Sequence, residues 1–262
     1  MLEFVDVQGL RIALRRRGRG EPVLLLHGGM SDSREWAAQL DDLSRDYDVV
    51  AVDVLGCGGS SDPPEGFGLA DHAHVLAGTL DVLGISPAHV IGLSLGSVLA
   101  LALYRERPQA VRTLVLAGAY AGWAGSLPPE EVESRTRMIL ETLDRPVEEW
   151  GPPFLATVHG INAPAELVDA SMAILRDVRP EASRSLVRAI ASADLREMLP
   201  SIAVPVLLIY GQDDQRAPRA VAAQLHAAIP GSTLVVVPGA GHAVNLEAPA
   251  EFDAAVRVFL GT

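Results

Sequence analysis

One serine stands in a pattern that is typical of a catalytic nucleophile. Residues 92–96 read Gly-Leu-Ser-Leu-Gly, directly after a short aliphatic run and at the start of a segment with helical spacing. A sharp turn from a buried strand into a helix would hold Ser94 on a strained backbone with its hydroxyl exposed, and only small residues fit two positions before and after it. Gly92 and Gly96 meet that need. We therefore predict that Ser94 is a nucleophile; a glycine-rich turn with a capping serine is the alternative.

A serine hydroxyl needs a base to take its proton, and the base needs an acid to orient it. Of the seven histidines, His242 lies in a loop directly after the last aliphatic run, so we expect it at the same sheet edge as Ser94. The other histidines are expected to be surface or packing residues. The acid should also follow a strand, and both Asp213 and Asp214 do so. Spacing alone does not choose between these two carboxylates.

The oxyanion of a tetrahedral intermediate needs N–H donors. We expect one from the backbone of Leu95, at the start of the helix after Ser94, where the helix dipole favours negative charge. The second is expected from the loop 27–30 (His-Gly-Gly-Met), whose glycines let the backbone approach a substrate oxygen. His27 itself is expected to have a structural role in that loop.

These groups must be positioned by a sheet, and the hydrophobic pattern indicates a parallel one. Uninterrupted runs rich in Val, Leu and Ile are typical of strands that are buried on both faces. Alternation of such runs with helical segments predicts a three-layer α/β fold, and the chain begins with an expected antiparallel hairpin over 4–14. The expected strands are 22–27, 48–54, 89–93, 111–117, 204–210 and 232–237, and the expected helices between them are 33–47, 69–83, 95–107, 218–228 and 249–260.

Residues 121–200 break this alternation. They contain helical segments at 130–143, 165–177 and 181–193, separated by proline-rich breaks, and no aliphatic strand run. We expect one α/β core made of residues 1–120 and 201–262, with residues 121–200 inserted as a helical cap over the carboxyl edge of the sheet, where ligands bind in open α/β sheets.

The apolar residues of this region are candidates for a substrate pocket that would suit an apolar acyl, lactone or aryl group. The alternative is that they pack the cap onto the core. The pocket candidates are Tyr120, Trp123, Met138, Trp150, Phe154, Ile161, Met172 and, beyond the cap, Val244.

Composition excludes several kinds of chemistry. The net charge is −12, and all 21 basic residues are Arg, so there is no lysine for a Schiff base, a phosphate-binding loop or a Ser–Lys pair. An acidic chain is a poor candidate for binding nucleic acid. The one cysteine, Cys57, excludes an internal disulfide and a CxxC metal site. No leader pattern or stretch of about 18–20 apolar residues is present, so we expect a cytoplasmic protein without a membrane partner.

The sequence resembles the α/β-hydrolase superfamily, in its single-domain branch with a helical cap. The resemblance implies that Asp214 is the triad acid, with Asp213 as the fallback, in the chain order Ser, Asp, His. It also implies that Gly29 supplies the second oxyanion N–H, with Met30 beside it in the pocket. The matching motifs, in the family's order, are Leu26-His27-Gly28-Gly29, Asp53-x-x-Gly56-x-Gly58-x-Ser60, Gly92-Leu93-Ser94-Leu95-Gly96, Gly211-x-x-Asp214, and Gly241-His242 followed by Glu247-x-Pro249.

Departures from related subfamilies narrow the expected activity. Epoxide hydrolases and haloalkane dehalogenases have Asp where this chain has Ser94. Carbon–carbon bond hydrolases and proline iminopeptidases usually carry a Gly-Pro-Gly-like loop where this chain has Met30-Ser31-Asp32, and many carbon–carbon hydrolases have Trp in place of Ala243. The Gly-Leu-Ser context is similar to that of small carboxylesterases and enol-lactonases.

We therefore predict a serine hydrolase that cleaves an ester or lactone through an acyl-enzyme, with no metal or organic cofactor. The net charge favours neutral apolar substrates over anionic ones. The same triad would also serve a thioesterase, an amidase, a cofactor-free haloperoxidase or a lyase or cyclase of secondary metabolism. An alternative of another class is a ligand-sensing homologue with very slow turnover.

Overall fold

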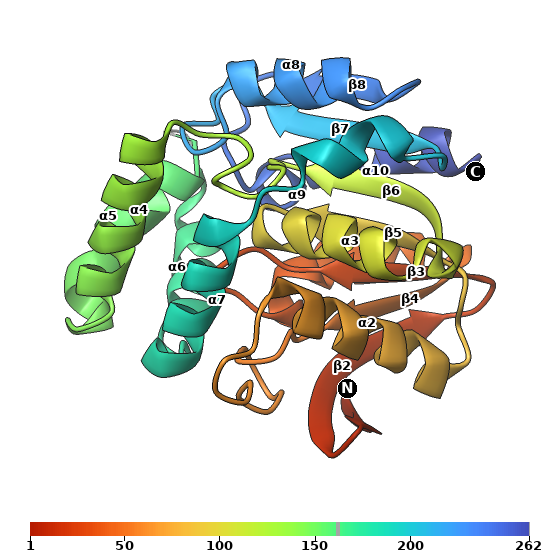
Figure 1. Ribbon diagram of the computed structural model, residues 1–262, viewed down its shortest axis with the longest axis horizontal. Helices are drawn as coiled ribbons and strands as arrows, with labels where there is room; N and C mark the ends of the chain where they lie inside the picture. The colour runs from red at the N-terminus through yellow and green to blue at the C-terminus, as the bar shows by residue number, and fades with distance from the viewer. Residues whose placement is uncertain (161–162, 262) are drawn as a thin grey trace.

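A mostly parallel sheet forms the centre of the computed structural model, which describes residues 1–160 and 163–261 (Figure 1). Its strands are β1 (Leu2–Val7), β2 (Leu10–Gly18), β3 (Glu21–Leu26), β4 (Tyr47–Val52), β5 (Ala88–Leu93), β6 (Val111–Ala117), β7 (Val206–Gly211) and β8 (Thr233–Val237). Their order across the sheet is β1-β2-β4-β3-β5-β6-β7-β8. The pairs among β3 to β8 are parallel, whereas β2 pairs antiparallel with both β1 and β4. The predicted α/β fold and its N-terminal hairpin are confirmed.

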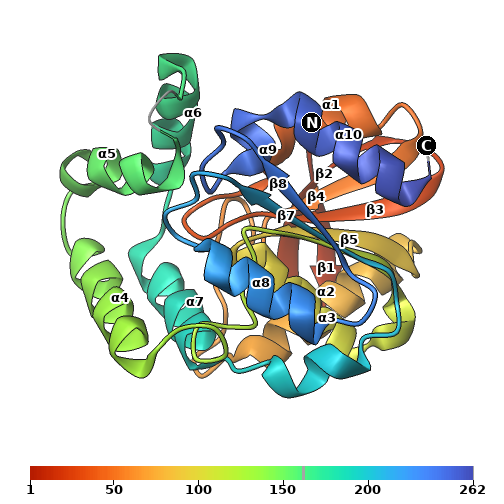
Figure 2. The ribbon, with the colours of Figure 1, turned by 90° about the horizontal axis from the view of Figure 1, so that it is seen from above.

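Helices cover both faces of the sheet, which is why the strands read as continuous apolar runs. Along β3, Val23 and Leu25 pack into the core on one face, and Leu24 and Leu26 pack into the core on the other. This alternation follows from the two-residue period of a strand. Figure 2 shows the two helical layers on opposite sides of the strands. One layer holds α1 (Ala37–Leu43), α9 (Val244–Glu247) and α10 (Pro249–Leu260), and the other holds α2 (Leu69–Leu83), α3 (Leu95–Glu106) and α8 (Arg219–Ala228).

Short 3-10 turns complete the connections at Ser33–Trp36, Pro108–Ala110 and Arg196–Ser201. The helix expected over 33–47 is thus a 3-10 turn followed by the short helix α1. No helix in the described ranges is both long and apolar enough to cross a bilayer.

Between β6 and β7, the described residues form four α-helices that we call the helical insertion. Figure 1 shows them at the left, beyond the carboxyl ends of the parallel strands. Ser94 directly follows β5 at this sheet edge, and the loop with His242 follows β8. They are α4 (Pro129–Thr142), α5 (Val147–Val158), α6 (Ala165–Leu175) and α7 (Pro180–Ser192).

Helix α5 corrects one expectation, because Pro152 and Pro153 lie inside it rather than in a break. A proline in a helix removes a backbone hydrogen bond and crowds the preceding turn. Both prolines are exposed, while Trp150 and Leu155 on the other side of α5 pack against residues of α6. This packing outweighs the local preference of the two prolines.

Candidate active site

The turn from β5 into α3 holds Ser94 in a conformation that a non-glycine residue rarely adopts, with φ 51° and ψ −109°. The Ser94 N–H donates to the carbonyl of Ala117 on the neighbouring strand (2.8 Å), which fixes the turn. A Cβ at Gly92 would lie 2.3 Å from the backbone of Gly96, and a Cβ at Gly96 would lie 2.0 Å from the carbonyl oxygen of Leu26. Both positions therefore require glycine for steric reasons.

His242 and Asp214 form a buried pair. His242 Nδ1 lies 2.8 Å from Asp214 Oδ2, and the two side chains are 4% and 2% exposed. Asp214 Oδ1 accepts the backbone N–H groups of Arg216 and Ala217, both at 2.8 Å. The structure therefore brings Asp214 to His242, whereas Asp213 is exposed.

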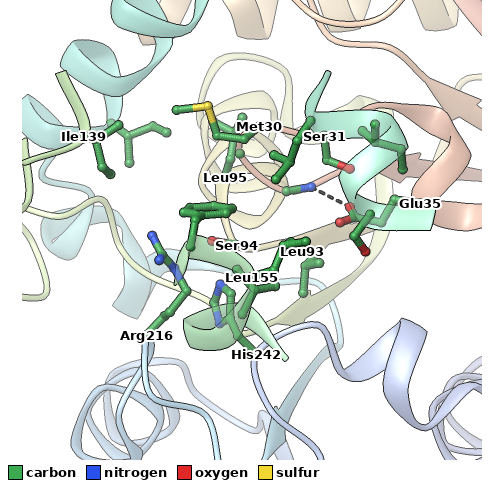
Figure 3. Close-up of a pocket in the computed structure, with 18 of the residues that line it drawn as sticks. Met30, Ser31, Glu35, Leu93, Ser94, Leu95, Ile139, Leu155, Arg216 and His242 are labelled. Carbon is green, nitrogen blue, oxygen red and sulfur yellow. Dashed lines mark hydrogen bonds between the residues drawn. The ribbon is translucent and has the colours of Figure 1, made fainter. Parts of the chain in front are cut away.

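The other ring nitrogen of His242 is left available. Nε2 is buried and has no hydrogen-bond partner in the described residues. Because Asp214 accepts the Nδ1 proton, the neutral ring carries its lone pair on Nε2, as a general base requires. Nε2 can therefore take a proton from a group inside the cavity that His242 and Ser94 both line (Figure 3).

The expected oxyanion donors lie beside this cavity. Leu95 is the first residue of α3, so its N–H has no intrahelical acceptor. The Gly29 N–H has no acceptor within the described ranges, and a Cβ at Gly29 would lie 4.0 Å from the Leu95 Cβ. The two backbone segments are thus close enough to address one substrate oxygen.

Sequence reasoning missed Glu35, which anchors the loop that carries Gly29. Glu35 Oε2 accepts the N–H of Gly28 at 2.7 Å, the contact drawn as a dashed line in Figure 3. Burial raises the pKa of the Glu35 carboxyl, while His27, the Gly28 N–H and Ser31 act in the opposite direction. One signal for Glu35 was present in the sequence, namely its position directly before Trp36. Residues next to a buried tryptophan also lie close to the core.

His27 has the structural role expected of it. Its Nε2 accepts the N–H of Val54 at 3.1 Å, and its Nδ1 lies 2.7 Å from the carbonyl oxygen of Gly28. The ring is fully buried. It therefore joins the loop 27–30 to the loop after β4.

The cavity above Ser94 has about 880 Å³ of empty space, part of it open to solvent. We call it the inner cavity. Four of the pocket candidates named from the sequence line it: Met30, Tyr120, Trp123 and Phe154. An adjoining outer groove shares Met30 and Phe154 with it and is also lined by Trp150 and Met138.

Two candidates lie elsewhere, and one lies outside the described residues. Val244 is fully buried in the core beside α10 and lines neither cavity, because α9 turns its side chain toward the sheet. Met172 packs within the helical insertion against Trp150 and Leu155. Ile161 lies outside the described residues.

A second residue that sequence reasoning missed is Arg216, two positions after Asp214. It lines both the inner cavity and the outer groove. The only signal in the sequence was its closeness to Asp214, the predicted acid.

Comparisons with known proteins show the family of this chain. A family model described as "Alpha/beta hydrolase family" matches residues 23–255. The chain belongs to the alpha/beta hydrolase family. Among curated relatives of this family member, the putative carbamate hydrolase RutD of Cronobacter sakazakii is 32% identical over 241 residues, which cover 89% of this chain and 88% of RutD.

Solved structures of the family share the fold. A thermophilic esterase from Thermogutta terrifontis has a TM-score of 0.88 and 27% identity, over 99% of this chain and 98% of the esterase. The enol-lactonase from Burkholderia xenovorans LB400 has a TM-score of 0.85 and 23% identity, over 99% of this chain and 100% of the lactonase. This similarity concerns the fold alone.

Proposed function

We propose that this alpha/beta hydrolase is a serine hydrolase that cleaves a small carboxylic ester or lactone. The observation that carries the proposal is the buried His242–Asp214 pair, whose Nε2 has no partner in the described residues, in a cavity that His242 and Ser94 both line. A nucleophile, a base and an orienting acid are the parts that acyl transfer requires.

In the first half of the proposed reaction, Ser94 Oγ attacks the substrate carbonyl while His242 Nε2 takes the hydroxyl proton. The carbonyl oxygen becomes an oxyanion and receives hydrogen bonds from the N–H groups of Gly29 and Leu95. Asp214 stabilises the imidazolium. Collapse of the intermediate breaks the carbon–oxygen bond of the ester, and His242 returns the proton to the departing alcohol.

In the second half, water attacks the acyl-Ser94 ester. His242 accepts a proton from this water, and the same two N–H groups hold the second oxyanion. Collapse releases the carboxylic acid and returns the proton to Ser94. Every step uses groups of this chain and water.

The relatives support this class of reaction and suggest a second candidate. RutD is named a putative carbamate hydrolase, and the Thermogutta protein is named an esterase. A carbamate carbonyl can be attacked in the same way as an ester carbonyl, so carbamate hydrolysis is the second candidate. Comparison of matched ester and carbamate substrates would separate the two.

We also propose that the helical insertion, with its flanking segments over 121–200, acts as a cap. Trp123, Phe154, Leu155 and Val187 come from this region and line the inner cavity. They contribute apolar walls to a site whose reacting groups come from the sheet edge. A substrate with an apolar body fits such walls.

Labelling with a fluorophosphonate probe tests the mechanism. We expect rapid labelling of the wild-type protein, and Ser94→Ala should lose both labelling and hydrolysis of p-nitrophenyl butyrate while keeping its circular dichroism spectrum. Ser192→Ala, which changes an exposed serine on α7, is the matched control and should label normally. Full activity of Ser94→Ala would contradict the mechanism, and an unlabelled wild type would favour the ligand-sensing alternative.

A further inference from the structure

Arg216 brings a positive charge to the inner cavity. Its side chain lines this cavity together with Ser94 and His242, and Figure 3 shows its guanidinium on the same side as those two residues. It also lines the outer groove, so it stands where the two spaces meet. A substrate that reaches Ser94 from the groove passes this group.

Both backbone polar groups of Arg216, its N–H and its carbonyl, form hydrogen bonds. Its N–H donates to Asp214 Oδ1 at 2.8 Å. Its carbonyl accepts from the Tyr120 hydroxyl and from Arg135 Nη1, the latter at 3.0 Å. The position of the Arg216 backbone is therefore tied to the acid of the proposed triad.

The side chain is also held, but by neutral groups. The guanidinium lies over the Phe154 ring, 4.9 Å from its centroid, and Nη1 donates to Thr157 Oγ1 at 2.9 Å. An aromatic face and a hydroxyl orient a guanidinium without pairing its charge with an acid. Asp214 favours this charge electrostatically without an ion pair, and the Arg135 cation opposes it. The fork of N–H donors that Arg presents matches a carboxylate in shape.

The other arginines of the outer groove differ in this respect. Arg135 pairs with Glu131, and Arg145 pairs with Glu149. Arg216 takes part in no ion pair within residues 1–160 and 163–261. Burial lowers the pKa of its guanidinium, which reflects the cost of a charge removed from water. A carboxylate delivered by a ligand would offset this cost through charge-assisted hydrogen bonds.

The other charged side chain of the inner cavity does not compete for that role. Glu35 is bound to the Gly28 N–H, and Figure 3 places it on the far side of the cavity from Arg216, beyond Leu93. Between them, the walls are mostly apolar and include Met30 and Phe154. The cavity thus offers an apolar space with a cation at one end.

We propose that Arg216 binds a carboxylate of the substrate, which makes the substrate class an ester or lactone with an apolar body and a carboxylate. The proposal rests on the proposed hydrolase function and refines it. It departs from the preference for neutral substrates that the net charge alone suggests. The local arrangement outweighs the net charge because surface charges are screened by salt over about 8–10 Å, while a half-buried pair is screened much less.

Two matched pairs of esters test the proposal, since the carboxylate can belong to either half of the substrate. In the first pair, mono-p-nitrophenyl glutarate carries the charge on the acyl chain, and p-nitrophenyl 5-methylhexanoate replaces its carboxylate by an isopropyl group. In the second pair, 3-acetoxybenzoate carries the charge on the alcohol part, and 3-isopropylphenyl acetate is its neutral counterpart. The measured quantity is the ratio of kcat/KM between the anionic and the neutral ester.

For at least one pair, we expect the anionic-to-neutral ratio of kcat/KM to be about 10-fold or more higher in the wild type than in Arg216→Gln. Most of this change should come from KM for the anionic ester. Arg216→Lys should keep part of the preference, because it keeps the charge but not the planar fork. Arg137→Gln removes the same charge from an exposed site on α4 that lines neither cavity, so its ratio should equal that of the wild type.

Equal ratios for wild type and Arg216→Gln in both pairs, with the esters still hydrolysed, would overturn this inference and leave the proposed function intact. Absent hydrolysis and absent labelling of Ser94 would contradict the proposed function instead. Calorimetric binding of the four esters to Ser94→Ala, with and without Arg216→Gln, tests the recognition step apart from turnover. Equal affinities for the charged and neutral members of both pairs would again reject it.

Discussion

The carbonyl oxygen of Val158 accepts the backbone N–H of His242 at 2.8 Å. Val158 is the last residue of α5, so the end of a helix in the insertion holds the loop of the proposed base. The N–H of Ala243 donates to the same carbonyl at 3.2 Å. Placement of the insertion and placement of the imidazole are therefore coupled through backbone hydrogen bonds.

Glu247 strengthens this connection and gives the first prediction. Its Oε2 accepts the N–H of Gly160 at 2.6 Å and that of Gly241 at 3.1 Å, across the same junction. Glu247→Ala leaves both N–H groups without this acceptor, at about 1–3 kcal/mol for each group that stays buried. We expect a lower melting temperature and a lower kcat. Glu247→Gln retains a carbonyl oxygen and should be the milder change; equal melting temperatures for the two variants would argue against the connection.

The choice between the adjacent aspartates gives the second prediction. In Asp214→Asn, the amide oxygen can keep the two backbone N–H bonds, and the amide nitrogen then faces His242 Nδ1. The Asn N–H would donate to Nδ1, so the imidazole proton would move to Nε2. A protonated Nε2 cannot act as a general base. We expect kcat for p-nitrophenyl butyrate to fall by about 10⁴-fold, the size of effect measured for this change in a serine protease. Asp213→Asn is the matched control and should stay near the wild-type rate. A comparable loss in both variants would contradict the assignment.

The third prediction concerns the loop that carries Gly29, the proposed oxyanion donor. Glu35→Ala removes the acceptor of the Gly28 N–H and leaves a space beside the loop that carries Gly29. Because a misplaced oxyanion donor costs about 10²–10³-fold in rate, we expect kcat to fall by up to that amount, with KM less affected. Glu35→Gln can still accept the N–H and should keep most of the activity. Equal kcat in the two variants would show that the hydrogen bond to Gly28 does not matter for catalysis.

The fourth prediction is a pH dependence of stability at Asp253, away from the site. Burial raises the pKa of this carboxyl to about 6 from its ordinary 3.8, with Asp42 adding to the shift and Gln39 and Arg257 opposing it. Between these values the unfolded chain releases the proton while the folded protein retains it. Stability is therefore lost as pH rises from about 4 to 6, and the cost remains above 6.

Asp253→Asn keeps an oxygen for the Gln39 amide and cannot ionise. We expect its melting temperature to exceed that of the wild type by a few degrees at pH 8 and to match it near pH 4. Thermal unfolding followed by circular dichroism measures this, with Asp169→Asn on the surface of α6 as control. The melting-temperature difference between Asp253→Asn and the wild type should therefore depend on pH. If this difference is the same at pH 4 and pH 8, ionisation of Asp253 is not its cause.

Much of the fold could be predicted because its signals are local. Strands buried on both faces are apolar at most positions. Every residue of β4, β5 and β7 is buried, and Asp48 of β4 and His89 of β5 are polar exceptions. The prediction failed at α5, where the rule for proline is also local. There the packing of Trp150 and Leu155 onto α6, which joins segments far apart in the sequence, decided the outcome.

The amino-acid sequence by itself determined the fold and the candidate residues Ser94 and His242, because each follows a predicted strand within a few residues. Tertiary structure alone decided that Val244 turns into the core and that Glu35 and Arg216 face the cavity. Spacing left Asp213 and Asp214 open, the family resemblance favoured Asp214, and the structure brings Asp214 to His242. Neighbouring residues of a loop point in different directions. Which of them reaches a site is set by hydrogen bonds and packing between distant segments, and residue spacing along the chain does not encode those contacts.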